Sequence, residues 1–274
     1  MSKNTEARNP KSKKLDQMSA VEIIRLMDED EQIVLQAVAR AETQIAEAAE
    51  MAAQTFIKGG RVIYVGAGTS GRIATMDAAE MPPTFGLEPD RFVALVSGGA
   101  ATNEKAQEDA EDDPHAAISD LNRLQVSNKD IVIGLAASGK TPYVLAAIRH
   151  ARQKGVWTCG IVNNPNTPIE AEANLGIVLR TGPEILTGST RLKAGTSQKL
   201  VLNRISTAAM VLAGKVVENL MVDVKAKNGK LKERCVRIVR DLSSATEDEA
   251  REHLEANDWN IRAVLDLLRE PARA

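Results

Sequence analysis

Apolar residues in the first part of the chain recur at helical spacing. Between residues 34 and 52 they follow one another in steps of four and three. These residues are Val34, Val38, Ala41, Ile45, Ala48 and Ala52. The pattern predicts helices over residues 19–58, because one face of a helix repeats every 3.6 residues. Ser19 and Glu22 have the spacing of a capping box at the start of this segment, and Gly59 ends it.

The pattern then changes to five short apolar runs that are rich in valine and isoleucine. The runs are Arg61–Val65, Arg91–Val96, Asp130–Leu135, Val156–Val162 and Leu175–Leu179. Such runs are typical of parallel strands that are covered on both faces. Helical stretches such as Pro142–Lys154 separate them. We therefore expect an α/β fold with a doubly wound, five-stranded parallel sheet, whose ligands bind at the carboxyl ends of the strands.

The remaining segments suggest the domain organisation. Residues 1–17 are basic and poor in apolar side chains, which predicts a disordered tail. Residues 191–224 are rich in Ala, Leu and Val and predict a long helix, and its broad apolar faces suggest burial on more than one side. Three amphipathic helices are expected after that, at Lys230–Asp241, Thr246–Ala256 and Trp259–Arg269. The expected domains are an α/β domain with N-terminal helices at 18–228 and a small helical bundle at 229–274.

Composition narrows the class of protein. The chain has 274 residues, 43% of them hydrophobic and 26% charged, which is usual for a soluble globular protein. A net charge of −2 argues against a nucleic-acid partner. Cys159 and Cys235 lack metal-ligand spacing and indicate inert thiols in a reducing compartment. No apolar run is long enough for a membrane span or a signal segment, so we expect a cytoplasmic protein.

The first loop with candidate chemistry is Gly66–Arg72, which follows a strand and opens a helix. Its glycines allow close backbone approach, and a helix start favours an anion. The segment also satisfies the G-x-G-x-x-G pattern of dinucleotide sites. That kind of site needs an acid at the end of the next strand, but this strand ends at Val96 without one. The hydroxyls of Thr69 and Ser70 favour a phosphate or a sugar instead.

The second loop, Ala137–Pro142, repeats this design with the hydroxyls of Ser138 and Thr141. With Gly134 it also satisfies the P-loop pattern G-x-x-x-x-G-K-T. A P-loop needs Gly134 in the turn after the strand, whereas the apolar pattern places it inside the strand. The simpler alternative for both hydroxyl loops is that they are ordinary helix caps.

Two acidic segments are candidates for acid–base chemistry. Glu80 precedes Pro82 and Pro83, which are expected to end the helix. In a last turn the helix dipole disfavours a negative charge, which suits a general acid, although Glu80 could also be an ordinary surface residue. Residues 108–113 contain five acids, which alone would indicate a solvated face. A carboxylate from this segment facing Glu80 would instead complete an acid–base pair.

A third hydroxyl-rich loop, residues 184–196, contains the cations Arg191 and Lys193 at another helix start. Guanidinium and ammonium groups pair well with phosphate or carboxylate. Capping and solubility are the alternative explanation of this composition.

Taken together, six stretches resemble the N-acetylmuramic acid 6-phosphate etherase family, and they occur in the family's order. They are Val65–Arg72, Asp77–Thr84, Ala110–Asp112, Ala136–Tyr143, Thr187–Thr196 and Asn219–Asp223. The resemblance implies the SIS (sugar isomerase) fold, a homodimer and a site for a small phosphorylated amino sugar, without metal or organic cofactor. The family cleaves the D-lactyl ether of its substrate with water, which yields N-acetylglucosamine 6-phosphate and D-lactate during cell-wall recycling.

The resemblance also implies roles for individual residues. Glu80 matches the acid that assists departure of lactate and activates the returning water, and Glu111 matches the base at C2. Other members of the SIS fold suggest that Ser138 and Thr141 hold the phosphate.

The same resemblance suggests that Thr69 and Ser70 contact the sugar. The last three helices resemble a ubiquitin-associated bundle and carry no motif with chemistry.

Two other functions stay open at this stage. The glucokinase regulatory protein resembles the same core, so a non-catalytic sugar-phosphate-binding regulator is the alternative, although the pair Glu80 and Glu111 favours an enzyme. An aldose–ketose isomerase is the other open function. His115, His150 and His253 lie outside the matching stretches, which argues against histidine-assisted ring opening.

Overall fold

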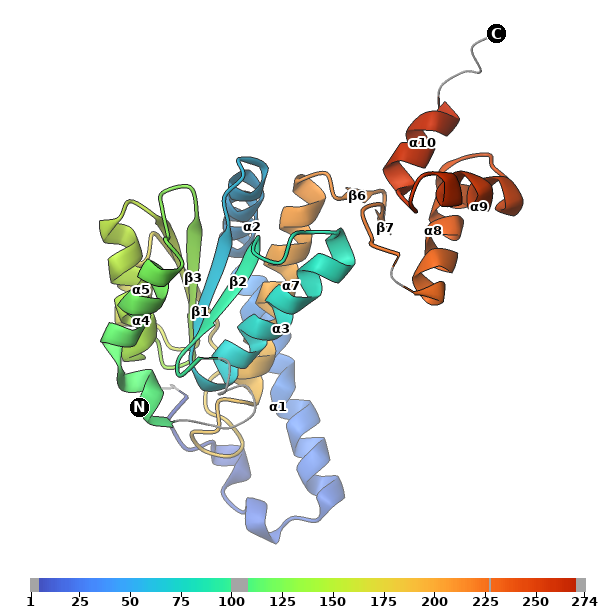
Figure 1. The fold of residues 1–274 in the computed structure, drawn as a ribbon. Coiled ribbons are helices and arrows are strands. Elements are labelled where there is room, and N and C mark those ends of the chain that lie inside the picture. The colour runs from blue at the N-terminus through green and yellow to red at the C-terminus, as the bar shows by residue number, and fades with distance from the viewer. Residues whose placement is uncertain (1–4, 100–107, 227, 270–274) are drawn as a thin grey trace. The chain divides into compact units, whose positions relative to one another are not determined.

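The computed structural model (Figure 1) describes residues 5–99, 108–226 and 228–269. Contacts within the chain define two units. The first contains Met1–Ala78 and Asp90–Ala209, and the second contains Ala79–Pro89 and Met210–Ala274. The division falls inside two helices, α3 (Gly68–Phe85) and α7 (Lys193–Leu212), whereas the sequence pattern suggests a boundary after residue 228.

The first unit is built on the predicted parallel sheet. Its strands are β1 (Val62–Gly66), β2 (Phe92–Val96), β3 (Ile131–Ala136), β4 (Trp157–Val162) and β5 (Leu175–Val178). All neighbours pair in parallel, in the order β2-β1-β3-β4-β5. The direction of winding therefore reverses between β1 and β3. Ligands of open α/β sheets bind at such a switch point, beyond the carboxyl ends of the strands.

Helices cover both faces of this sheet, as the apolar strands require. The helices of this part of the chain are α1 (Ala20–Arg40), α2 (Glu42–Ile57), α3 (Gly68–Phe85), α4 (Pro114–Arg123), α5 (Pro142–Gln153), α6 (Pro168–Glu172) and α7 (Lys193–Leu212). α4 and α5 lie on one face, and α2 with the first parts of α3 and α7 lies on the other (Figure 1). Fully buried side chains such as Ile63, Val144 and Ile148 fill the α4/α5 side.

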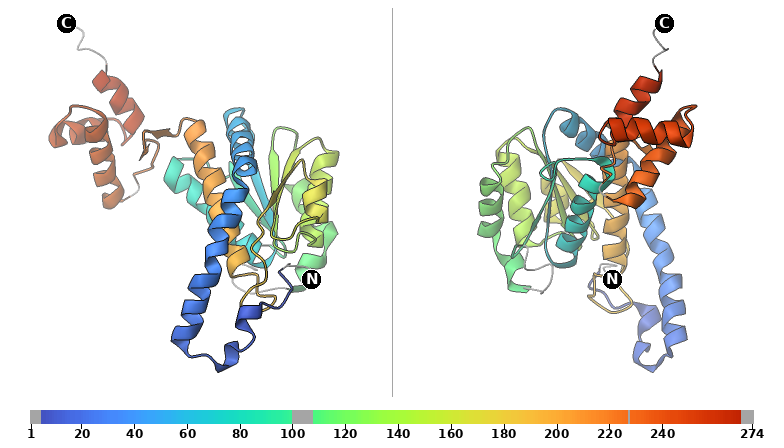
Figure 2. Two further views of the ribbon diagram at one scale, coloured as in Figure 1. Left: turned by 180° about the vertical axis from the view of Figure 1, so that it is seen from behind. Right: turned by 45° about the vertical axis from the view of Figure 1, so that its right-hand side comes forward.

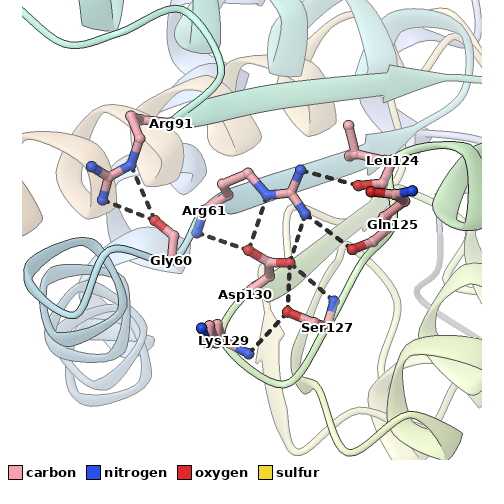
Figure 3. Close-up of polar contacts among 8 residues, drawn as sticks. All are labelled: Gly60, Arg61, Arg91, Leu124, Gln125, Ser127, Lys129 and Asp130. Carbon is pink, nitrogen blue, oxygen red and sulfur yellow. Dashed lines mark hydrogen bonds and ion pairs between the residues drawn. The ribbon is translucent and has the colours of Figure 1, made fainter.

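A polar cluster fixes β1 against β3 at the amino ends of the strands (Figure 3). The Arg61 guanidinium donates to both carboxylate oxygens of Asp130, at 3.0 and 2.8 Å. The backbone N–H of Ser127 donates to the same carboxylate. Burial acts to raise the pKa of Asp130, but these hydrogen bonds outweigh it and hold that pKa below its ordinary value. Arg91 similarly donates to the carbonyl of Gly60.

Helix α3 continues past the residues that were predicted to end it. Pro82 and Pro83 lie inside the helix, which runs to Phe85. Proline has a φ compatible with a helix and lacks only the N–H, so two prolines near the end remove hydrogen bonds without forcing a stop. The helix instead ends at Gly86, which adopts φ +66° and donates to the carbonyl of Pro82. Glu80 is therefore not in the last turn, and the argument from the helix end does not apply to it.

The N-terminal segment also differs from the prediction. Residues 5–17 are not a disordered tail but contain two 3-10 helices, η1 (Pro10–Ser12) and η2 (Leu15–Gln17). Thr5 and Asn9 are buried, with 0% and 4% of their surface exposed. Hydrogen bonds to residues far along the chain satisfy both side chains, and composition alone does not reveal such partners. Residues 1–4 of the predicted tail lie outside the described residues.

In the second unit the three predicted C-terminal helices are present. They are α8 (Gly229–Leu242), α9 (Glu247–Ala256) and α10 (Ile261–Arg269), after a small hairpin of β6 (Val216–Val217) and β7 (Leu220–Met221). Thr246 and Glu249 form the capping box of α9. Cys235, Leu254 and Val264 belong to the buried core of this unit. Among the described residues, no helix combines the length and hydropathy needed to cross a bilayer.

Candidate functional site

The two hydroxyl loops lie where the topology predicts a ligand, at the ends of β1 and β3. Ser138 and Thr141 are half-buried neighbours, with their hydroxyl oxygens 3.4 Å apart. Thr141 directly precedes α5, but its side chain makes no capping hydrogen bond. Among the described residues, the Ser138 oxygen accepts from within its own loop, from the N–H of Lys140 at 3.3 Å. The simple explanation as a helix cap therefore fails for Thr141.

Gly134 lies inside β3, where it pairs with Val65 of β1 and Gly160 of β4. The turn after the strand therefore lacks the first glycine of a P-loop, and the pattern G-x-x-x-x-G-K-T is coincidental here.

The other hydroxyl loop, at the start of α3, lies beside the start of α7. The Thr69 side chain packs closely against Gly195 of α7, since a Cβ built onto this glycine would lie 3.3 Å from Cγ2 of Thr69. Ser70, the next residue, is 8% exposed. The structure thus brings the first turns of α3 and α7 together, so that the 184–196 loop borders the Thr69 loop.

Glu184 caps α7 from across that loop. Its buried carboxylate accepts from the backbone N–H groups of Lys193 and Ala194, at 3.1 and 2.9 Å. Burial raises the pKa of Glu184, although these hydrogen bonds act in the opposite direction. The carboxylate fixes the loop at its base, which keeps residues 185–192 close to the end of the sheet.

The two cations of this loop have different surroundings. The Lys193 ammonium is buried and lies 2.5 Å from Asp30, and it also donates to the carbonyl of Pro183 at 2.8 Å. The predicted substrate cation Lys193 is therefore already paired within the fold, where it holds α1 to the start of α7. Arg191 is exposed on the same loop.

A buried polar network that the sequence analysis did not identify holds the end of β4 to α7. The amide of Asn163 donates to the hydroxyls of Ser197 and Thr181, at 2.9 and 3.3 Å. The Gln198 amide donates to the Asn163 oxygen at 3.0 Å. The pair Asn163-Asn164 directly after an apolar strand is the signal that would have indicated it.

Glu111 lies in η4 (Glu108–Asp112), a short helix that packs against α5 near the carboxyl ends of the strands (Figure 1). Its side chain is exposed. Asp113, from the same acidic cluster, has a structural role, since it caps α4 by accepting from the N–H groups of His115 and Ala116. The cluster is therefore more than a solvated face.

Glu80 is exposed and belongs to the second unit, whereas the other candidate residues belong to the first. One turn earlier on α3, Asp77 is buried among polar partners. It accepts from the hydroxyls of Tyr64 at 3.0 Å and Ser206 at 3.3 Å, and Lys199 lies 3.7 Å away. Burial raises the pKa of Asp77 despite these partners. Asp77 therefore fixes α3 to β1 and α7, a role the sequence analysis missed.

Neither metal ligation nor thiol chemistry is indicated in the described part of the chain. Within it, no three His, Cys, Asp or Glu side chains converge to hold a metal ion. Cys159 and Cys235 are free and buried, and burial raises the pKa of both thiols. Buried thiols with a raised pKa are poor nucleophiles and poor metal ligands.

Comparisons with known proteins agree with this geometry. Residues 44–152 match the glucokinase regulatory protein N-terminal SIS domain, and residues 113–205 match the SIS domain. The N-acetylmuramic acid 6-phosphate etherase of Pectobacterium atrosepticum is 49% identical over 96% of this chain and 88% of its own length. That of Mycolicibacterium smegmatis is 46% identical over 96% of this chain and 89% of its own. This chain belongs to the N-acetylmuramic acid 6-phosphate etherase family.

Solved structures support the fold of the family member described here. A putative phosphosugar isomerase involved in capsule formation from Bacteroides fragilis superposes with a TM-score of 0.54 at 20% identity, over 77% of this chain and 99% of that one. A phosphoheptose isomerase from Francisella tularensis gives a TM-score of 0.52 at 16% identity, over 70% of this chain and 98% of that one. The predicted SIS fold is thereby confirmed.

Proposed function

We propose that this chain is an N-acetylmuramic acid 6-phosphate etherase. It is a lyase that cleaves the D-lactyl ether by elimination and water addition, and it releases N-acetylglucosamine 6-phosphate and D-lactate for amino-sugar recycling. Membership of the etherase family over nearly the whole chain is the observation that carries the proposal. The half-buried hydroxyl pair of Ser138 and Thr141 at a strand switch point supports it.

In this proposal the phosphate binds at the start of α5. The hydroxyls of Ser138 and Thr141 donate to its oxygens, and the first N–H groups of the helix add to the attraction for an anion. Thr69 and Ser70, at the start of α3, contact the sugar. Lys193 is already paired with Asp30, so in this proposal Arg191 is the cation of the third loop that binds an anionic group of the substrate.

The chemistry follows from the open-chain form of the sugar. Its aldehyde at C1 acidifies the C2 proton, which the Glu111 carboxylate removes. The electron pair then expels the C3 ether oxygen, and Glu80, as the acid, protonates that oxygen so that lactate leaves. Water activated by Glu80 adds at C3, and return of the proton at C2 completes the product. The protein needs no metal or organic cofactor for these steps.

We also propose that the enzyme works in the cytoplasm as a homodimer with no nucleic-acid partner. Helix α1 exposes Val21, Ile24 and Leu35, with 64%, 59% and 58% of their surface accessible. Clusters of exposed apolar side chains are typical of surfaces that another protein chain covers. A second copy of the chain is the simplest partner for them.

The test is a product analysis with N-acetylmuramic acid 6-phosphate as substrate. We expect lactate and N-acetylglucosamine 6-phosphate in equal amounts. A ketose product without lactate would show that the protein is an isomerase. Saturable binding with no product would show the regulator instead.

A further inference from the structure

The N-terminal segment Thr5–Asn9 is fastened to the loop that contains Ser138. The N–H of Thr5 donates to the side-chain oxygen of Asn164 at 3.0 Å, and the Asn164 amide donates back to the Thr5 hydroxyl at 2.9 Å. The same amide also donates to the carbonyl of Ala137, the residue directly before Ser138, at 3.2 Å. Asn164 therefore joins the beginning of the chain to a candidate phosphate loop.

The other end of the segment is fastened to the third loop. The Asn9 amide donates to the Asp30 carboxylate at 3.0 Å and to the carbonyl of Pro183 at 3.3 Å. Lys193 donates to these same two residues. Thr5–Asn9 is thus held at both ends, and the ribbon shows it running past the carboxyl ends of the strands toward α1 (Figure 2).

Glu6 lies between these two anchors. Its side chain is exposed, and a Cβ added at Gly188 would be 3.7 Å from its carboxylate oxygen. Within the described residues, the Glu6 carboxylate has no hydrogen-bond or ion-pair partner. An acid that has no partner among the described residues therefore lies between the loop of Ser138 and the loop of Arg191.

We propose that Thr5–Asn9 forms one wall of the sugar-phosphate site and that Glu6 is a specificity-determining residue. This inference rests on the proposed function, because it uses the same site. A carboxylate accepts strong hydrogen bonds from hydroxyls and repels anions. Glu6 therefore accepts hydrogen bonds from the hydroxyls of the sugar, and it adds nothing to the binding of phosphate alone.

The experiment compares Glu6→Gln with the wild-type chain in lactate release from N-acetylmuramic acid 6-phosphate. Loss of a hydrogen bond to a charged group should raise KM about 10-fold, while kcat stays within about twofold. Affinity for N-acetylglucosamine 6-phosphate, measured by calorimetry, should fall by a similar factor. Affinity for inorganic phosphate should not fall. Glu50→Gln, on the exposed face of α2, is the matched control and should change none of these quantities.

Two further variants separate specificity from a structural role. Glu6→Asp keeps the charge and should recover part of the affinity. Asn164→Ala removes the anchor and should raise KM in the same direction as Glu6→Gln. The melting temperature of Glu6→Gln should equal that of the wild type, because the side chain is exposed.

The outcomes distinguish this inference from the proposed function. If the wild type releases lactate and Glu6→Gln retains its KM and product affinity, the inference is wrong and the function stands. If the wild type releases no lactate but binds N-acetylglucosamine 6-phosphate, and Glu6→Gln loses that binding, the function is wrong and the inference stands. A wild type that does neither overturns both.

Discussion

Among single residues, Glu80 acts in two steps of the proposed mechanism, departure of lactate and addition of water. In the proposed mechanism its carboxylic acid donates a proton to the departing ether oxygen. An amide cannot make this transfer, so Glu80→Gln should lower kcat for lactate release by about 100-fold or more. Affinity for N-acetylglucosamine 6-phosphate should be retained. Glu252→Gln, on the exposed face of α9, is the control. Unchanged turnover in Glu80→Gln would remove this residue from the mechanism.

Asp77 gives a residue-scale prediction about pH. Its pKa is raised in the folded chain, so folding disfavours the ionised form. The folded state therefore holds more protons than the unfolded state between the ordinary aspartate pKa of about 4 and the raised value, and stability falls as pH rises through that window. Asp77→Asn removes the titrating carboxyl and with it this loss of stability.

The measurement is urea unfolding of wild type and Asp77→Asn at pH 4 and pH 7. The variant should gain stability relative to the wild type as pH rises, while Asp28→Asn, an exposed aspartate on α1, should show no such trend. A relative loss for Asp77→Asn between pH 4 and pH 7 would mean that the ionised carboxylate stabilises the fold.

At the scale of elements, the five strands and the C-terminal helices could be predicted because local pattern determines them. The strand predictions differ from β1–β5 by at most one residue at either end. The end of α3 could not be predicted, because it depends on a contact distant in sequence. Gly86 adopts φ +66°, and a Cβ there would lie 2.1 Å from the carbonyl oxygen of Asp223.

Because of this contact, Gly86→Ala tests whether α3 ends at Gly86 against the Asp223 backbone. A left-handed conformation costs an alanine about 1–2 kcal/mol, and the clash with Asp223 adds to that cost. Gly59→Ala is the matched control, since Gly59 also follows a helix with positive φ but has nothing within 4 Å of its added Cβ. Urea unfolding should show a clearly larger loss of stability for Gly86→Ala. Equal losses would contradict the close contact in the second unit.

At the scale of the whole molecule, the sequence identified the family and the loops but not how each residue is used. Ser138 and Thr141 belong to one loop in the sequence, and their hydroxyls lie together because both residues follow β3. Lys193 was predicted to bind the substrate, because charge alone does not show that Asp30, 163 residues earlier in the chain, pairs with it. The role of Thr5–Asn9 was missed for the same reason, since its partners are distant in sequence.

The central claim is that this chain cleaves a lactyl ether by elimination followed by addition of water. The most direct measurement is the reaction of N-acetylmuramic acid 6-phosphate in ¹⁸O-labelled water, with both products analysed by mass spectrometry. We expect a labelled oxygen at C3 of N-acetylglucosamine 6-phosphate, counted apart from solvent exchange at C1, and none in the ether oxygen that leaves with lactate. Absence of lactate, or solvent label in that oxygen of lactate, would contradict it.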